Sequence, residues 1–326
     1  MATSSRVGTR FVKGPCKNMI MTSEFTFHSR IDDLNISVLV VRPEDKPKAV
    51  VQIAHGVCGC KEKFLPMMEY MAERGVACVA GDHRGHGHSI RAIDDLGYMY
   101  EGGYLALVDD MRMITQWIHS TFPATPVYLV GHSMGSMAAR IYAKYDDSAI
   151  DGLVLTGSPS WNPFSRVGKM LAGLMCMIGL SHYRVTLIQR ITSDRYNRRF
   201  SSEGRLAWTC SDPKVRQSYT DNPVCNFVLT ANGSYNVMCM MEETYNGRWT
   251  VSNPQLPIFF ISGSDDPMMG SERNFHESAQ YICDRGYMNV TSAIYPGMRH
   301  EVLNEIGKEE VWNEILDFIG LRVCAR

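Results

Sequence analysis

One stretch of the chain decides the fold: the sequence VYLVGHSMGSMAAR, which runs from Val127 to Arg140. Its first four residues are apolar or aromatic, which predicts a buried strand, and a helix is predicted from Met134 to Tyr145. Between strand and helix stands the pentapeptide GHSMG. A sharp strand-to-helix turn of this kind projects a serine hydroxyl away from the backbone, and its small flanking residues avoid clashes. We therefore predict that Ser133 is a nucleophile; an ordinary strand-to-helix turn is the alternative.

On both sides of this stretch, short apolar runs alternate with amphipathic segments. The predicted strands are Ile36–Val41, Ala49–Ala54, Val76–Ala80, Val127–Val130, Leu153–Leu155, Pro257–Ile261 and Val290–Tyr295. The predicted helices are Lys63–Arg74, Tyr104–His119, Met134–Tyr145, Ser271–Arg285 and Lys308–Leu321. Repeated strand–helix units imply a mostly parallel sheet flanked by helices, which is an α/β fold.

The alternation is interrupted between residues 159 and 253, where no strand–helix pattern is visible. The chain has 326 residues, a length that suits one main core with an insertion. We therefore expect three segments: a first part of the core at 1–158, a helical cap at 159–253 and a second part of the core at 254–326.

Composition excludes some classes of protein. The formal net charge is −1, which gives no electrostatic reason to expect a nucleic-acid partner. The ten cysteines are scattered without a Cys-x-x-Cys, so reduced thiols in a cytoplasmic protein are expected. The first twenty residues contain no continuous apolar segment, so no secretory signal is predicted. The apolar run Met170–Leu180 is shorter than the roughly 20 residues that a membrane span needs.

A serine nucleophile needs a base, and the base needs an acid to orient it. In folds with this turn the order along the chain is serine, acid, histidine. Asp265 and Asp266 both follow the strand at Pro257–Ile261, and we favour Asp266 because Pro267 fixes the chain beyond it. Two histidines come later: His276 lies on a predicted helix, whereas His300 lies in a loop after the last strand. We predict that His300 is the base.

An acyl transfer also needs N–H donors for the developing oxyanion, which contribute about 3–4 kcal/mol. Met134, the residue after the nucleophile, supplies one backbone N–H. The second donor is expected from the loop that follows Ala49–Ala54, and Val57 is the candidate there. A plain strand-to-helix loop is the alternative.

Together these segments resemble the monoacylglycerol lipase and lysophospholipase branch of the α/β hydrolases, which is grouped with serine aminopeptidase-like proteins. The matching blocks are Ala54-His55-Gly56, the segment GDHRGHGHS at 81–89, GHSMG at 131–135, and the segments around Asp266 and His300. The resemblance implies a triad of Ser133, Asp266 and His300. It also implies an oxyanion hole built from Val57 and Met134, and no cofactor. Monoacylglycerol or lysophospholipid esters would be the substrates.

Three other interpretations compete with this one. His83, His86 and His88 could bind a metal, although the glycines between them fit the structural loop of the resembling family. A non-catalytic binding module on the same fold would usually lack one of the three triad residues. An aminopeptidase, or a small-ester esterase, is the main alternative within the hydrolases.

An aminopeptidase would need cap acids such as Glu242 and Glu243 for the amine. The Met-rich run Met170–Leu180 instead favours an acyl chain or transient contact with a membrane surface, although a buried cap helix explains it equally well. The expected protein is cytoplasmic, and peripheral contact with a membrane through its cap is the alternative location.

Overall fold

The computed structural model describes residues 7–13 and 19–321. Part of the N-terminal stretch considered for a secretory signal therefore lies outside the described residues, as do Cys16 and Cys324. The eight cysteines in the described part of the chain are all free thiols. No helix in that part is both long and apolar enough to cross a bilayer.

The described residues form a nine-stranded sheet in the order β1-β2-β3-β5-β4-β6-β7-β8-β9. Its six strands from β5 to β9 in that order run parallel, and β1, β2 and β3 pair antiparallel at one edge. The strands are β1 (Val7–Lys13), β2 (Met19–His28), β3 (Asn35–Pro43), β4 (Ala49–Ala54), β5 (Val76–Gly81), β6 (Val127–His132), β7 (Gly152–Thr156), β8 (Ile258–Gly263) and β9 (Val290–Tyr295). The predicted α/β class with a mostly parallel sheet is confirmed.

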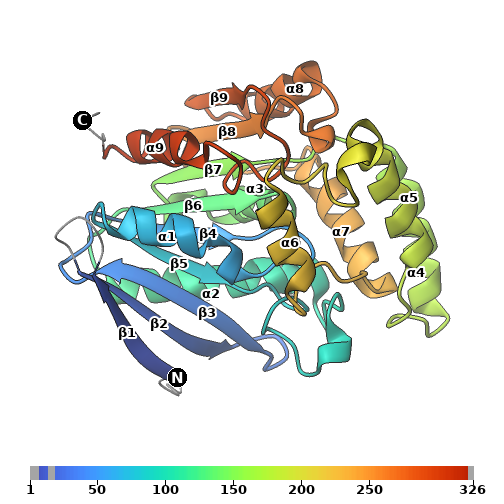
Figure 1. The fold of residues 1–326 in the computed structure, drawn as a ribbon, viewed down its shortest axis with the longest axis horizontal. Coiled ribbons are helices and arrows are strands. Elements are labelled where there is room, and N and C mark those ends of the chain that lie inside the picture. The colour runs from blue at the N-terminus through green and yellow to red at the C-terminus, as the bar shows by residue number, and fades with distance from the viewer. Residues whose placement is uncertain (1–6, 14–18, 322–326) are drawn as a thin grey trace.

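Helices cover both faces of this sheet (Figure 1). Helices α2 (Gly103–Thr121), α3 (Met134–Asp146) and α8 (Glu272–Cys283) pack into one hydrophobic core. Helices α1 (Leu65–Ala72) and α9 (Lys308–Phe318) pack into the core on the opposite face. Burial on both faces explains why the parallel strands are continuous apolar runs: all six residues of β4 and all six of β5 are buried.

Strands β1 and β2 were not predicted. In β2 only Ile20 and Phe27 are buried, and the remaining eight residues are partly or fully exposed. An edge ribbon of this kind buries too little of its surface to show a continuous apolar run. The predicted helix at Lys63–Arg74 begins instead as a 3-10 turn, η1 (Lys61–Phe64), before α1.

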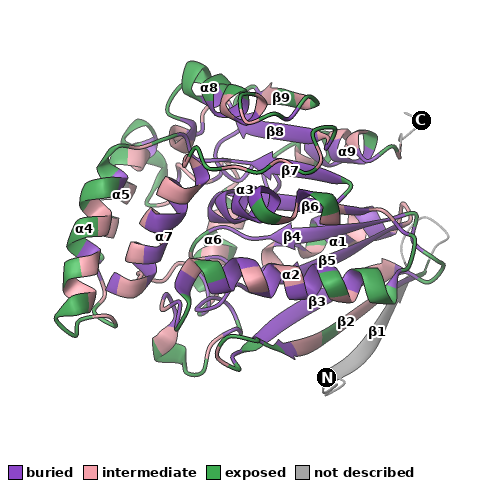
Figure 2. Ribbon diagram, turned by 180° about the vertical axis from the view of Figure 1, so that it is seen from behind, coloured by how far each residue is buried: buried purple, intermediate pink, exposed green. Residues whose placement is uncertain are grey.

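Four α-helices lie between β7 and β8, beside one end of the sheet (Figure 1). They are α4 (Phe164–Met177), α5 (Thr186–Asn197), α6 (Pro213–Asp221) and α7 (Ala231–Thr244). Much of α4 is exposed, in contrast to the buried strands (Figure 2). Met170 and Met177 in the Met-rich run have exposed fractions of 66% and 83%, so a buried helix is the wrong interpretation of that run.

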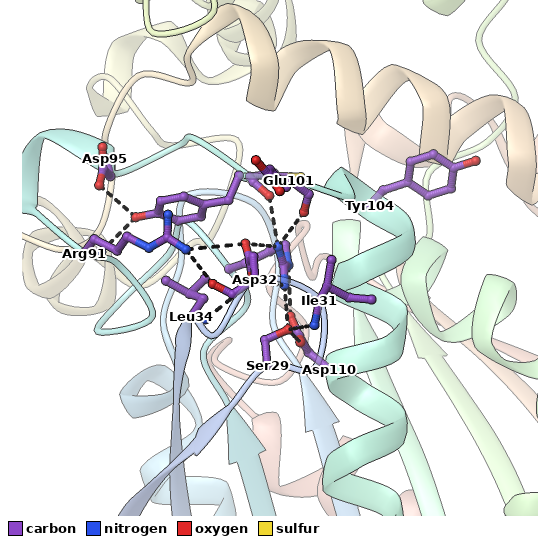
Figure 3. A network of polar contacts seen from close by, with 12 residues as sticks. Ser29, Ile31, Asp32, Leu34, Arg91, Asp95, Glu101, Tyr104 and Asp110 are labelled. Atoms are coloured by element: carbon purple, nitrogen blue, oxygen red, sulfur yellow. Dashed lines mark hydrogen bonds and ion pairs between the residues drawn. The ribbon is translucent and has the colours of Figure 1, made fainter.

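A buried arginine ties the edge strands to the central sheet. Arg84 follows β5, and its guanidinium lies 2.9 Å from a carboxylate oxygen of Asp110 on α2 and 3.0 Å from one of Asp32 in the turn between β2 and β3. It also donates to the Ser29 hydroxyl and to the Glu101 carbonyl. Figure 3 shows Ser29, Asp32, Glu101 and Asp110 converging on this point.

Replacing Asp110 with asparagine should lower the free energy of unfolding by about 2–3 kcal/mol, because it removes one of two carboxylates that neutralise a buried guanidinium. Chemical denaturation measures the loss. Asp109→Asn is the matched control, since Asp109 is more exposed and lies 3.9 Å from Arg112. Equal losses in the two variants would contradict the central role of Arg84.

Candidate active site

Ser133 lies at a sharp turn between the last residue of β6 and the first residue of α3. Its φ is 53° and its ψ is −118°, an uncommon backbone conformation for a residue with a side chain. Two flanking glycines permit this turn. A Cβ atom on Gly131 would lie 2.5 Å from the Gly135 carbonyl oxygen, and a Cβ on Gly135 would lie 2.1 Å from the Ala54 carbonyl oxygen. The small residues of the pentapeptide are therefore required by close backbone approach.

The structure brings Ser133, His300 and Asp266 together in one hydrogen-bonded chain. The Ser133 Oγ lies 2.8 Å from His300 Nε2, and His300 Nδ1 lies 3.0 Å from Asp266 Oδ2. A carboxylate can only accept, so Nδ1 carries the proton and Nε2 accepts from the serine hydroxyl. The three residues are 3% or 4% exposed, so bulk water does not compete for these contacts.

The two rival residues lie elsewhere. Asp265 lies in the turn after β8, and its carboxylate is 2.8 Å from the guanidinium of Arg199, which belongs to the segment between β7 and β8. His276 is exposed on α8, where its ring contacts Phe275. Of the two acids and two histidines considered in the sequence, the structure places Asp266 and His300 at the nucleophile.

Burial and charge act against each other on His300. Burial lowers the pKa of His300, but the Asp266 carboxylate, acting through charge and a hydrogen bond and helped by Glu301, outweighs burial, and the net pKa is raised above 6.5. Glu301 also raises this pKa, whereas Lys63 lowers it. Asp266 therefore stabilises the charged form of His300, the form that would result when His300 accepts the proton of a serine.

The loop after β4 lies directly against Ser133. A Cβ on Gly56 would be 3.1 Å from the Ser133 Cβ, so only a glycine fits there without displacement. His55 fixes this loop: its Nδ1 lies 2.7 Å from the Gly56 carbonyl oxygen, and its Nε2 accepts from the His83 backbone N–H at 2.9 Å. Burial lowers the pKa of His55 well below 6.5, so the ring stays neutral and keeps both contacts.

The two candidate oxyanion donors come from different segments: Val57 lies in the loop after β4, and Met134 directly follows the turn at Ser133. Met134 is the first residue of α3, a position whose N–H has no partner within the helix. Val57 follows Gly56 in the loop after β4 and is 37% exposed.

Further residues at the site were not identified from the sequence. Glu301 lies 2.6 Å from Lys63 Nζ, and its second oxygen lies 3.5 Å from His132 Nε2. The Trp208 ring, from the segment between β7 and β8, lies 5.3 Å from the His300 ring. Lys63 and Glu301 are 238 positions apart, so no local pattern could have paired them.

Within the segment 81–89, the Asp82 carboxylate makes structural contacts. The Asp82 carboxylate accepts from the Lys61 and His88 backbone N–H groups, each at 2.8 Å, and lies 3.0 Å from Lys61 Nζ. A Cβ on Gly87 would lie 2.2 Å from this carboxylate, which explains the glycine. Within residues 7–13 and 19–321, no group of three histidine, cysteine or acidic side chains is arranged to hold a metal ion.

Comparison with known proteins identifies the family of the chain. The sequence profile described as serine aminopeptidase, S33 matches residues 45–307. The chain belongs to this family. The predicted resemblance to the monoacylglycerol lipase branch of α/β hydrolases is confirmed by relatives and structures.

This S33 hydrolase is similar to three proteins that cover nearly all of it. A monoglyceride lipase homolog of Monkeypox virus is 31% identical over 294 residues, covering 86% of this chain and 93% of its own. A monoacylglycerol lipase of Mycolicibacterium smegmatis is 23% identical over 301 residues, covering 91% and 96%. The crystal structure of a thermostable carboxyl esterase from Bacillus coagulans superimposes with a TM-score of 0.83 at 26% identity, covering 92% and 98%. The S33 hydrolase is thus a carboxylic-ester hydrolase.

Gly135→Ala should destabilise the fold by about 2–4 kcal/mol, because a methyl group there would overlap the Ala54 carbonyl of β4. Thermal unfolding measures the change. Gly168→Ala on helix α4 is the matched control: its new methyl group would lie 3.5 Å from the Met238 side chain of α7, an ordinary contact, and stability should stay equal or rise. Equal stability of Gly135→Ala and the wild type would contradict the close approach.

Proposed function

We propose that this carboxylic-ester hydrolase cleaves monoacylglycerol or lysophospholipid esters through an acyl-enzyme on Ser133, with His300 as base and Asp266 orienting it. The observation that carries the proposal is the continuous hydrogen-bonded chain from Ser133 Oγ through His300 to Asp266. A hydroxyl, an imidazole and a buried carboxylate in this order are the groups that activate a serine for acyl transfer.

The reaction follows from these contacts. The Ser133 oxygen attacks the acyl carbonyl while its proton passes to His300 Nε2, and the carbonyl oxygen becomes an oxyanion. The backbone N–H groups of Met134 and Val57 stabilise that charge. His300 then protonates the departing alcohol, leaving the acyl group on Ser133. A water that loses its proton to His300 releases the carboxylic acid and regenerates the serine.

The charges in the cap favour an ester over an amine-bearing peptide. An aminopeptidase pocket needs an acid free to bind the substrate ammonium. Glu243 is ion-paired with Lys144, and Glu242 is ion-paired with Lys169. Both carboxylates are therefore already neutralised. The relatives named as monoglyceride or monoacylglycerol lipases point in the same direction.

Residues 159–253 act in this proposal as a cap that covers the site and meets the lipid. Trp208 and Thr209 from this segment reach the loop that carries His300: the Glu301 backbone N–H donates to the Thr209 carbonyl at 2.7 Å. Helix α4 presents an apolar surface, which we call the α4 face. Its exposed members are Phe164, Val167, Met170, Leu171, Leu174 and Met177.

The α4 face is suited to transient contact with an anionic membrane surface. Exposed arginines follow it in the chain, at Arg190, Arg195, Arg198 and Arg205. Exposed apolar side chains of a helix together with exposed basic side chains are the combination that holds amphipathic helices at the bilayer interface. A cytoplasmic protein with this face would meet its lipid substrates at the membrane surface.

Ser133→Ala should reduce ester hydrolysis by about 10⁴-fold or more while leaving the fold unchanged, because the nucleophile is lost. The assay compares monoacylglycerols, lysophospholipids, p-nitrophenyl esters and aminoacyl amides, together with labelling by a fluorophosphonate probe. Ser158→Ala, which removes another buried hydroxyl, is the control and should retain activity. Full turnover by Ser133→Ala would overturn the mechanism, and preference for aminoacyl amides would overturn the substrate class.

Replacing Met170 and Met177 together with serine should weaken binding to vesicles that contain anionic phospholipid by about tenfold, since two exposed apolar side chains are lost from the α4 face. Vesicle sedimentation measures the binding. Hydrolysis of a water-soluble p-nitrophenyl ester should not change. Met288→Ser is the matched control, because Met288 is 70% exposed but lies outside the cap. Equal vesicle binding by all variants would show that α4 is not the contact surface.

A further inference from the structure

A buried ion pair, Lys63–Glu301, lies beside the site and has no part in the mechanism described so far. Lys63 Nζ and Glu301 Oε1 are 2.6 Å apart, and their side chains are only 11% and 8% exposed. The second Glu301 oxygen accepts from the Asn304 side-chain amide at 3.2 Å. Burial raises the pKa of Glu301, but Lys63, His132 and His300 together outweigh burial, and the pKa of this carboxyl lies well below its ordinary value. Glu301 is therefore ionised beside Lys63.

The pair joins the two loops that flank Ser133. Lys63 lies in η1, at the end of the loop that carries Gly56 and Val57, and its Cδ would be 3.3 Å from a Cβ on Gly59. Glu301 is the residue after His300. Relative movement of the two loops would therefore have to break a contact between buried opposite charges, or carry both charges along.

Stability alone is a poor explanation for such a pair. Removing two charges from water costs several kcal/mol per ion, and well-packed apolar residues often serve equally well. The cap seals the pair further, because the Tyr219 ring lies 3.8 Å from Lys63 Nζ. The pair therefore costs desolvation energy, and what it provides is a fixed position for the His300 loop and fixed charges next to His300.

The charged and titratable groups around His300 come from four elements. Asp266 approaches from the turn after β8, His132 from the end of β6, Lys63 from η1, and Glu301 from the histidine's own loop. The His132 ring is 4.9 Å from the His300 ring, and burial lowers its pKa, so it stays neutral. Arg299 on the same loop is paired with Glu203. Asp266, Glu301 and Lys63 therefore set the local charge.

Resting on the proposed function, we infer that Lys63 and Glu301 are positioning residues: they hold the His300 loop against the Val57 loop, and their opposite charges balance the protonation of His300. Neither side chain needs to touch the substrate. Glu301 favours the imidazolium and Lys63 disfavours it, so the pair leaves His300 available as a neutral base while keeping the carboxylate of Asp266 the dominant influence.

The test is the pH dependence of kcat/KM in the intact protein. Activity requires neutral His300, so kcat/KM should rise with pH through the pKa of His300. In Glu301→Gln a stabilising negative charge is lost, and the rise should move to lower pH by about one unit. In Lys63→Met a repelling positive charge is lost, and the rise should move to higher pH by about the same amount. The double variant should return towards the wild-type midpoint.

The positioning role predicts a second signature. Each single variant should lower kcat by about tenfold or more with a smaller change in KM, because misplaced reacting groups slow the chemistry. Glu301→Asp and Lys63→Arg keep the charges, so they should keep the wild-type midpoint even where kcat falls. The matched control is Arg273→Gln with Glu277→Gln, which removes an exposed ion pair on α8 and should change neither quantity.

An NMR titration of ¹³C-labelled histidine separates this inference from the proposed function. The His300 resonance reports the same opposite shifts whether or not an ester is hydrolysed. Unchanged midpoints in both single variants, or shifts in the same direction, would overturn the inference even if the wild type is an active esterase. If one single variant does not fold, the other decides the outcome, because its midpoint should still move in its own direction.

Discussion

Ser133 occupies a backbone conformation with φ of 53°, and the close packing of β4, β6 and α3 holds it there. Residues forced into sparsely populated conformations cost about 1–3 kcal/mol and persist only where the surroundings determine them. Here the surroundings are glycines at 131 and 135, which let α3 begin against the end of β4. The same approach brings the loop after β4 and the N-terminus of α3 to one side of the serine. Every other residue of the site is placed relative to this turn.

The order of strands then selects which turns can reach the serine. β6, β7, β8 and β9 are consecutive neighbours, so the turns after β6, β8 and β9 meet at one edge of the sheet. The turn after β7 lies between them and contributes Gly157. A Cβ there would lie 2.9 Å from the His300 carbonyl oxygen and 3.0 Å from the His132 ring. Because Gly157 has no side chain, the His300 imidazole fits against this turn. Asp266 lies in the turn after β8, the next strand of the sheet.

Sequence patterns recovered the parts of this arrangement that depend on local chemistry. Doubly buried strands are continuous apolar runs, so β4 to β8 could be predicted, and the turn around Ser133 is fixed by its glycines. The half-exposed β2 shows no such run. Pro267 favours Asp266 over Asp265 in the sequence, but the physical difference between them is tertiary: Arg199 binds the Asp265 carboxylate, whereas Asp266 faces His300. The Lys63–Glu301 contact joins distant segments and depends on the finished sheet.

The separation of Ser133 and His300, 167 positions along the chain, has a consequence for synthesis. Chains fold from the N-terminus as they are made, and distant contacts form late because loop closure must come first. A nascent chain that ends before β8 would contain the serine turn without its imidazole and carboxylate. Under the proposed mechanism, ester cleavage is therefore a property of the assembled sheet, and an unfinished chain would be inert.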